Sequence, residues 1–399
     1  MPRDPAAFRL PRVVKSLGWV SLFTDVATEM AYPLLPAFLV SIGAGAQALG
    51  LVEGIAESVS AGVKWLAGRS SDARARRPFV LFGYALATVV RPLLAIATSA
   101  WQVILIRTTD RIGKGIRSAP RDALVAEAVP PERRGHAFGF HQMMDNIGAG
   151  VGPLLAFVLL RGFHVSLKAV FALTLIPGLF AVATITWGVK EPRRVVEPRA
   201  APEAAAQADA ALPARLRTYL ALVALFTLGA SADSFLMLRL SDLGLSAVWI
   251  PIAWISLNVS KALLNIPGGT ISDRFGRKRT QVAAWLVYAL VYALFPATRS
   301  VAATWCLLVF YGAYYGLSEG GEKAIVADLS PPAVRGRGYG ALHAVTGLAV
   351  LPANAVFGAL YARHVELAFW LSAACALAAA VGLALLRATK EPRGAGASV

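Results

Sequence analysis

The chain has 399 residues, of which 57% are hydrophobic and only 16% are charged. A soluble globular domain carries about 25% charged residues, so this composition argues against a soluble protein. The formal net charge of +16 would suit a nucleic-acid-binding protein, but the basic residues form no single patch or tail. We therefore expect no nucleic-acid partner.

Long apolar blocks alternate with short polar connections along the whole chain. A helix needs about 20 mostly apolar residues to cross a hydrocarbon core of roughly 30 Å. We predict an all-α membrane protein with twelve transmembrane helices embedded in a lipid bilayer. The first six predicted spans are 16–42, 45–68, 78–98, 101–127, 135–161 and 165–189. The last six are 216–241, 246–270, 279–298, 301–328, 336–362 and 366–388.

The spans fall into two sets of six, which predicts an N-terminal bundle at 1–189 and a C-terminal bundle with a short tail at 216–399. Residues 190–215 between them are rich in Ala, Pro and charge, so they cannot bury a core and are expected to form a linker. Cys306 and Cys375 each lie inside an apolar block, which indicates neither a disulfide nor a metal site. We expect no metal and no cofactor.

Basic residues are distributed unequally between the two sides of the predicted membrane. Most of the 39 Lys and Arg residues lie in the N-terminus, the linker, the C-terminus and the loops from even to odd helices. The loops on the other side hold only Arg161, Lys168, Arg299 and Arg363. Because cytoplasmic loops carry the excess of Lys and Arg, both termini are predicted to be cytoplasmic in a cell inner membrane.

The two halves repeat each other with a constant offset of 201 residues. The sequence Ala123-Leu-Val-Ala-Glu127 recurs as Ala324-Ile-Val-Ala-Asp328, and two loop motifs recur with the same offset. Parallel repeats of this kind place a substrate path at their interface.

The loop after the second helix of the later half reads Gly269-x3-Asp273-Arg274-x-Gly276-Arg277-Lys278. This pattern resembles the characteristic cytoplasmic loop of the major facilitator superfamily. The first-half copy differs from it at Ala73 and Ala75, where Arg and Gly are usual. A carboxylate there can pair with an arginine or cap a helix in one state and release it in another. The candidate residues of a cytoplasmic gate are Gly68, Asp72, Arg76, Gly269, Asp273, Arg274, Gly276 and Arg277.

The resemblance extends to helices four and five. Arg107 resembles the arginine of the family's fourth helix, although Asp110 and Arg111 replace the Gln and Gly that commonly follow it. Gly148-x3-Gly152-Pro153 resembles the signature of the antiporter branch. The resemblance implies alternating access between two bundles, a small-molecule substrate, a monomer and no enzymatic activity.

Helix four is expected to carry a stripe of charge along one face. At about 100° per residue, its ionisable side chains fall within an arc of about 120°. Charged side chains at membrane depth cost free energy and rarely face lipid. The resemblance implies that this stripe lines the central path. Its members are Arg107, Asp110, Arg111, Lys114, Arg117 and Arg121.

Acidic residues mark other predicted spans. Asp25 and Glu29 lie one turn apart in helix one, and His141 and Asp145 lie one turn apart in helix five. Glu29 and Lys114 should lie at a similar depth. The candidates for proton coupling are Asp25, Glu29, Glu57, Asp145 and His141. Further candidates along the substrate path are Asp233, Asn258, Tyr311, Tyr315, Glu319 and Glu322.

A structural interpretation remains open, in which these charges pair only to fix helix packing. The functional prediction is a secondary transporter, with protons as the coupling ion, that exports a small anionic or zwitterionic solute or drug. The density of Arg and Lys favours carboxylate or phosphate groups on the substrate. Alternatives are an importer or exchanger of an organic anion or sugar phosphate, an exporter of a cation or metal ion, and a membrane-embedded enzyme.

Overall fold

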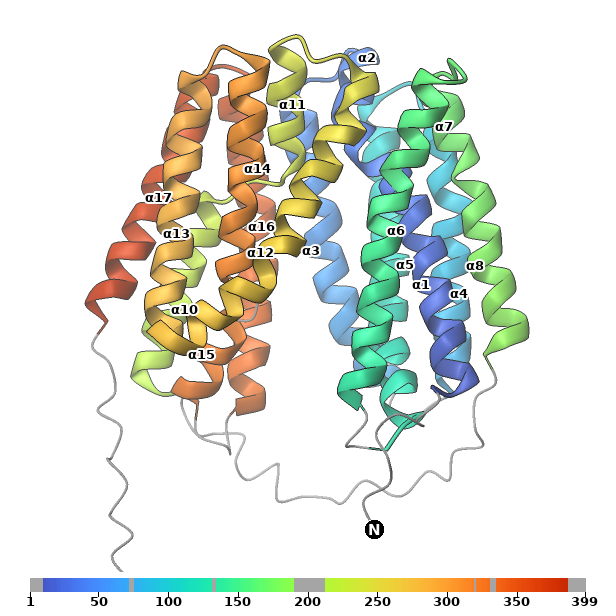
Figure 1. Ribbon diagram of the computed structural model, residues 1–399, viewed down its shortest axis with the longest axis horizontal. Helices are drawn as coiled ribbons and strands as arrows, with labels where there is room; N and C mark the ends of the chain where they lie inside the picture. Colours follow the sequence, from blue (N-terminus) through green and yellow to red (C-terminus); the bar gives the residue numbers. More distant parts are fainter. Residues whose placement is uncertain are drawn as a thin grey trace, which may run out of the picture.

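The computed structural model describes residues 10–71, 75–130, 134–189, 212–318, 321–330 and 335–386. Every regular element within these ranges is a helix. The helices form two groups that lie side by side and approach each other toward one end (Figure 1). Most of the predicted linker, residues 190–211, lies outside the described ranges, and the domain boundaries stay a prediction.

The helices before the linker correspond closely to the six predicted spans. They are α1 (Arg12–Ala31), η2 (Tyr32–Leu34), α2 (Leu35–Ser41), α3 (Ala46–Ser71), α4 (Arg76–Val90), η3 (Arg91–Ile96), α5 (Ala100–Glu127), α6 (Arg134–Arg161), α7 (Leu167–Leu173) and α8 (Leu175–Gly188).

The helices after the linker follow the same plan. They are α10 (Ala214–Gly229), α11 (Ser234–Asp242), η5 (Ala247–Trp249), α12 (Ile250–Phe275), α13 (Arg277–Leu294), η6 (Phe295–Ala297), α14 (Val301–Ser318), α15 (Gly321–Leu329), α16 (Arg335–Tyr361) and α17 (Val365–Leu385).

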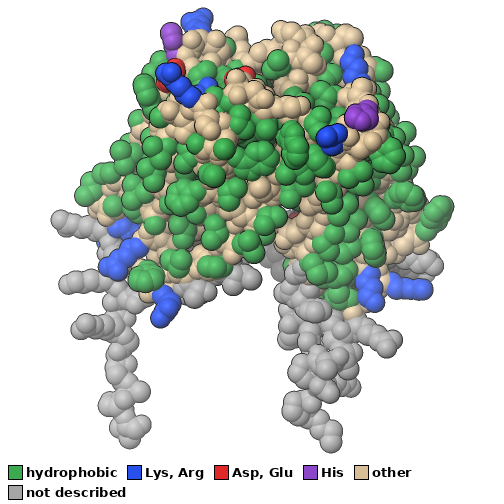
Figure 2. All heavy atoms as spheres, turned by 45° about the horizontal axis from the view of Figure 1, so that its top comes forward, with side chains coloured by type: hydrophobic (Ala, Val, Ile, Leu, Met, Phe, Trp, Pro, Cys, Tyr) green, Lys and Arg blue, Asp and Glu red, His purple; other side chains and the backbone are tan. Residues whose placement is uncertain are grey.

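The outer surface suits a lipid environment. Large apolar side chains such as Ile96, Trp187 and Leu385 are exposed, and Figure 2 shows hydrophobic side chains over the visible flank with Lys and Arg toward its two ends. Among the described residues, nine helical segments are long and apolar enough to cross a membrane. The other three predicted spans also coincide with helices, at 12–41, 46–71 and 100–127, but these carry embedded charges. The count of twelve stays a prediction.

Several predicted spans are interrupted rather than continuous. The first predicted span is interrupted at η2, which contains Pro33 and separates α1 from α2. Proline has no backbone N–H to donate, so it disrupts the hydrogen bonds of a regular helix. The span predicted at 216–241 divides into α10 and α11, with residues 230–233 outside both helices. The backbone N–H of Ser231 donates to the Tyr288 hydroxyl at 3.3 Å, and that of Ala232 to Asn354 Oδ1 at 2.8 Å. Side chains of α13 and α16 therefore replace the helical hydrogen bonds at this break.

The two halves touch along small residues. A Cβ added to Gly50 in α3 would lie 2.1 Å from the carbonyl oxygen of Asn354 in α16, and Ser58 Oγ donates to the carbonyl oxygen of Gly347 at 2.8 Å. Phe157 of α6 packs against Trp249 at a ring distance of 5.3 Å. Away from these contacts the halves diverge toward the end where α1 begins (Figure 1). In the predicted orientation this end faces the cytoplasm.

Candidate functional site

The crossing of α1 and α6 places the two acidic residues of the first helix. A Cβ added to Gly148 would lie 2.8 Å from Cβ of Asp25, and one added to Gly152 would lie 2.9 Å from Cβ of Glu29. Only hydrogen fits at these two positions, so the glycines of the antiporter-like motif let α6 lie directly against the acidic stretch of α1. Pro153 follows inside α6.

His141 and Asp145 of α6 lie close to the same stretch. His141 Nδ1 lies 3.5 Å from an Asp145 carboxylate oxygen, and the His141 side chain is buried. Asp145 also interacts electrostatically with Asp25 of α1. The structure therefore brings four of the five predicted proton-coupling residues to one helix crossing: Asp25, Glu29, His141 and Asp145.

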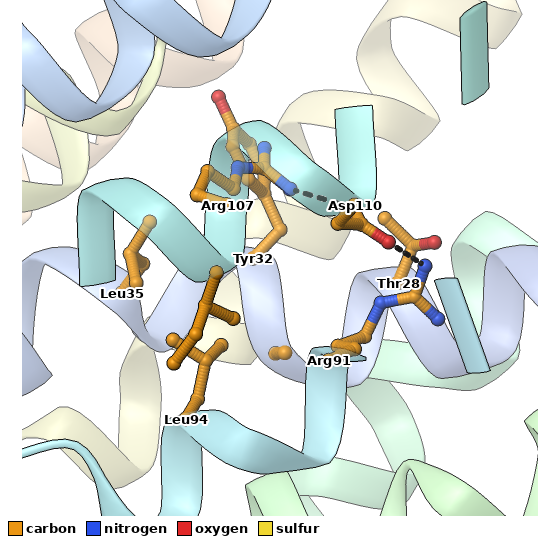
Figure 3. A pocket seen from close by; sticks show the side chains of 9 residues that line it. Thr28, Tyr32, Leu35, Arg91, Leu94, Arg107 and Asp110 are labelled. Carbon is orange, nitrogen blue, oxygen red and sulfur yellow. Dashed lines mark hydrogen bonds and ion pairs between the residues drawn. The ribbon is translucent and has the colours of Figure 1, made fainter. Parts of the chain in front are cut away.

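The first part of the predicted stripe on α5 is neutralised by carboxylates. Arg91 Nη2 lies 2.7 Å from Asp110 Oδ1, and Arg107 Nη1 lies 3.6 Å from Asp110 Oδ2. Arg107 also lies 3.9 Å from Glu53 and stacks over the Tyr32 ring at 4.6 Å. Figure 3 shows how Arg91 and Arg107 approach Asp110 from opposite sides beside Tyr32. The two arginines and two carboxylates of this buried network balance in charge, which suits a structural role.

The remaining cations of the stripe have different surroundings. Arg111 Nε pairs with Glu57 Oε1 at 2.9 Å. Arg117 lies 4.3 Å above the Tyr84 ring, and Arg121 pairs with the adjacent Asp122 at 2.8 Å. Lys114 is exposed, and no carboxylate of the described residues lies within ion-pair distance of its ammonium group.

Lys114 nevertheless lies among acidic side chains. Its ammonium group interacts electrostatically with Glu57 of α3 and Asp25 of α1. Arg111 and Arg117 of the same helix repel it, and neither carboxylate forms an ion pair with it. An exposed cation in this position is available to an anionic group from solution.

The second half contributes a compact polar cluster. Asp233, at the start of α11, accepts hydrogen bonds from the Tyr311 hydroxyl at 3.2 Å and the Tyr315 hydroxyl at 3.0 Å. Lys261 Nζ lies 2.8 Å from Asp233 Oδ2. Asn258 instead donates to the Trp254 carbonyl of its own helix at 3.1 Å.

One contact links the two halves directly. The indole Nε1 of Trp254 in α12 donates to Glu29 Oε2 at 2.7 Å, and the Trp254 ring packs edge-on against Tyr32 at 5.2 Å. The Trp254 partner of Glu29 was not predicted. Helical periodicity describes one helix at a time, so it contains no signal for a pair on opposite halves.

The candidate gate residues are partly described. Arg76 pairs with Glu127 and Arg277 with Asp328, each at 2.6 Å. Gly276 adopts φ +90°, which favours glycine, and it separates α12 from α13. Arg274 lies in the last turn of α12, and Gly68 and Gly269 lie within α3 and α12.

The remaining predicted residues lie in α15, or they or their side chains lie outside the described part of the structure. Glu322 lies in the first turn of α15. Asp72, Glu319 and the side chain of Asp273 lie outside what the structure describes. Within the described residues, no group of three or more His, Cys, Asp or Glu side chains is arranged to hold a metal ion.

Comparison with known proteins identifies the family to which this fold belongs. The family model of the Major Facilitator Superfamily matches residues 17–260 and 252–398. An uncharacterized transporter of this type from Methanocaldococcus jannaschii is 31% identical over 367 residues, covering 90% of this chain and 91% of the relative. An uncharacterized protein of Mycobacterium tuberculosis is 30% identical over 361 residues, covering 88% of this chain and 87% of the relative.

Two further matches are more distant. The multidrug resistance protein MdtH of Cronobacter sakazakii is 29% identical over 153 residues, covering 37% of this chain and 38% of that protein. The crystal structure of the nucleoside transporter NupG superposes with a TM-score of 0.79 at 13% identity, covering 94% of this chain and 99% of that one. This last similarity shows the fold alone. The chain therefore belongs to the Major Facilitator Superfamily, and it is a multi-pass membrane protein for secondary transport rather than an enzyme.

Proposed function

We propose that the chain is a proton-coupled antiporter of the inner membrane that exports a small organic solute bearing an anionic group. The observation that carries the proposal is Lys114. It is the cation of the α5 stripe that is exposed and forms no ion pair within the described part of the chain. Arg107 and Arg111 are already bound by carboxylates, so neither is free to hold a substrate.

Electrostatic competition would couple this site to protons. Asp25 and Glu57 lie near Lys114, and each attracts its ammonium group while ionised. Protonation of Asp25 removes one of these charges and so changes the affinity of Lys114 for a substrate anion. This coupling between protonation and anion binding requires no new contact. It requires only a change in the charge of a carboxylate beside a cation.

Two observations support export. The α6 glycines that contact Asp25 and Glu29 form the antiporter-like motif, which links that motif to the acidic residues through direct contact. In addition, a partial relative carries the name of a multidrug resistance protein. The proposed monomeric state follows the family resemblance.

Purified protein in sealed liposomes containing a pH-sensitive dye tests the proposal. Addition of a transported anionic solute should move protons in the direction opposite to the solute, and an imposed pH gradient should concentrate the solute. Solute movement that is unaffected by a collapsed pH gradient would refute the coupling. Proton and solute movement in the same direction would instead establish a symporter.

A further inference from the structure

The cluster around Asp233 has the features of a site for an ammonium group. Asp233 lies where α10 and α11 separate, and the Tyr311 and Tyr315 hydroxyls donate to its carboxylate. These two donors come from α14 and hold the carboxylate in place whatever else binds it. The carboxylate is nearly buried, with a side-chain exposure of 10%.

Aromatic rings complete the surroundings. The ammonium group of Lys261 lies 3.6 Å from the centroid of the Tyr315 ring and 5.7 Å from that of Trp254. A carboxylate combined with the faces of a tyrosine and a tryptophan is how proteins recognise ammonium groups of ligands. Here the ammonium group belongs to the chain itself, on a flexible four-carbon stem that can move away.

The cluster borders the interface between the halves. Trp254 donates to Glu29 and packs on Tyr32, both of the first half. Asp233 in turn interacts electrostatically with Tyr32 and Glu53. A solute between the halves would therefore meet the Asp233 cluster on the second half beside Glu29 and Tyr32 of the first half.

We propose that Asp233, Tyr315 and Trp254 form an ammonium subsite that Lys261 occupies in the absence of solute, and that the solute is a zwitterion. The inference rests on the proposed function, and it specifies the substrate class. The solute's ammonium group takes the place of Lys261 beside Asp233, and its anionic group binds the displaced Lys261.

Charge balance selects a zwitterion over the two simpler classes. A purely cationic solute that displaced Lys261 would leave the lysine charged and without an anion. A purely anionic solute that drew Lys261 away would leave Asp233 without its cation. Either uncompensated charge is costly in a low-dielectric environment, whereas a zwitterion supplies a partner to both residues.

Three small probes of similar shape separate these classes: glycine betaine is a zwitterion, choline is a cation and 3,3-dimethylbutyrate is the anion that matches betaine. Binding to purified protein is measured by calorimetry. In the wild-type protein, betaine should bind at least about tenfold more tightly than choline or 3,3-dimethylbutyrate. Equal or tighter binding of 3,3-dimethylbutyrate would overturn the inference.

Two variants test the subsite itself. Lys261→Met removes the resident ammonium group and should raise choline affinity at least about tenfold. The double variant Asp233→Asn, Lys261→Met removes both charges, leaves no unpaired ion that could unfold the protein, and should lose that gain. The control Lys168→Met removes an exposed lysine elsewhere and should leave choline binding unchanged.

The outcomes also distinguish this inference from the proposed function. If the single and double variants bind choline equally, Lys261 and Asp233 form a structural ion pair and the subsite does not exist. The proposed function would survive that result if Lys114→Gln still weakened the binding of 3,3-dimethylbutyrate. In the opposite case, Lys114→Gln would leave the binding of 3,3-dimethylbutyrate unchanged while Lys261→Met still raised choline affinity. That result would refute the anion site and support the ammonium subsite.

Discussion

Lys114 differs from Arg107 and Arg111 of α5 in having no carboxylate bound to it, and from the buried Arg117 in being exposed. Arg107 and Arg111 lie one turn apart on the same helix and are both held in ion pairs. Removing Arg107 would leave the buried Glu53 carboxylate without its partner, which typically costs about 3–5 kcal/mol, and removing Arg111 would break its ion pair with Glu57. Removing the exposed charge of Lys114 leaves no such defect, so Lys114 is the residue at which substrate binding and stability can be separated.

Lys114→Gln should weaken the binding of an anionic solute at least about tenfold, or about 1.4 kcal/mol, with little change in melting temperature. The charge that attracts the anion is lost, while the ion pairs of Arg107 and Arg111 remain. Calorimetry and thermal unfolding measure the two effects. Lys168→Gln, which removes an exposed lysine from the first turn of α7, is the control and should change neither. Unchanged anion affinity in Lys114→Gln would mean that the cargo binds elsewhere.

Asp25 and Glu29 are expected to carry the coupling proton. Asp25→Asn and Glu29→Gln keep the size of each side chain, and the amide introduced by Glu29→Gln retains an oxygen that can accept from Trp254. We expect both variants to exchange labelled solute across liposomes at equal pH but to lose accumulation driven by a pH gradient. The exposed Glu366→Gln is the matched control. Full accumulation by both acidic-site variants would transfer the proton role to Glu57 or Asp145.

At the scale of helices, the contact between α1 and α6 depends on two glycines, Gly148 and Gly152, which have no side chain. A Cβ on Gly152 would lie 2.7 Å from the carbonyl oxygen of Val26, and the backbone there cannot rotate away as a side chain can. The third glycine of this stretch, Gly150, faces open space: a Cβ added there would have no atom within 4 Å. The same helix therefore offers both a test position and its control.

Gly152→Ala should destabilise the protein by about 1–3 kcal/mol, because the added methyl group forces α1 and α6 apart. Gly150→Ala should be neutral or stabilising, since alanine favours the helix over glycine by up to about 1 kcal/mol. Thermal unfolding of both variants in the same detergent measures the difference. Equal melting temperatures for the two would show that the close helix contact does not contribute to stability.

The interrupted helices have a different physical basis. The break between Gly229 and Ser234 contains no proline, and it exists because Tyr288, Tyr292 and Asn354 bind the freed backbone and the Ser231 side chain. Without those partners, unpaired backbone groups at membrane depth would cost several kcal/mol each. The break in turn presents Asp233 to Lys261 and the tyrosines.

At the scale of the whole molecule, the contacts between the two halves determine at which end the halves meet and at which end they diverge. Ser58 of α3 donates to Gly347 of α16, and Trp254 donates to Glu29 near the last residue of α1, whereas the halves diverge toward the end where α1 begins (Figure 1). Alternating access requires these contacts to separate while the opposite end closes. Contacts of small residues and single hydrogen bonds suit an interface that must open repeatedly.

A cross-link between Ala61 and Gly347 tests that requirement. A Cβ at Gly347 would lie 2.9 Å from Cβ of Ala61, so a small helix shift gives the Cβ separation of about 3.8 Å found in disulfides. In a protein with Cys306 and Cys375 replaced by Ala, the double cysteine variant should lose transport on oxidation and recover it on reduction. The two single-cysteine variants serve as controls. Transport at the full rate in the cross-linked protein would show that this contact does not need to open.

The sequence by itself determined the helices, the family and the positions of the embedded charges. Hydropathy and the repeat offset depend only on the order of residues, and helix formation in lipid satisfies each backbone within its own segment. The same periodicity placed Asp25 with Glu29, and His141 with Asp145, each pair on one face. It also predicted the stripe of charge on α5.

Only the tertiary structure decided what each charge contacts. Glu29 and Trp254 are separated by 225 residues, and Lys261 of α12 is separated by 28 residues from Asp233, which precedes α11. No period along the chain encodes such pairs, because they depend on how helices cross and on which side chains the crossing leaves exposed. The neutralised Arg107 and the exposed Lys114 look alike in the sequence, and the difference between them arises from carboxylates that neighbouring helices bring to one and not to the other.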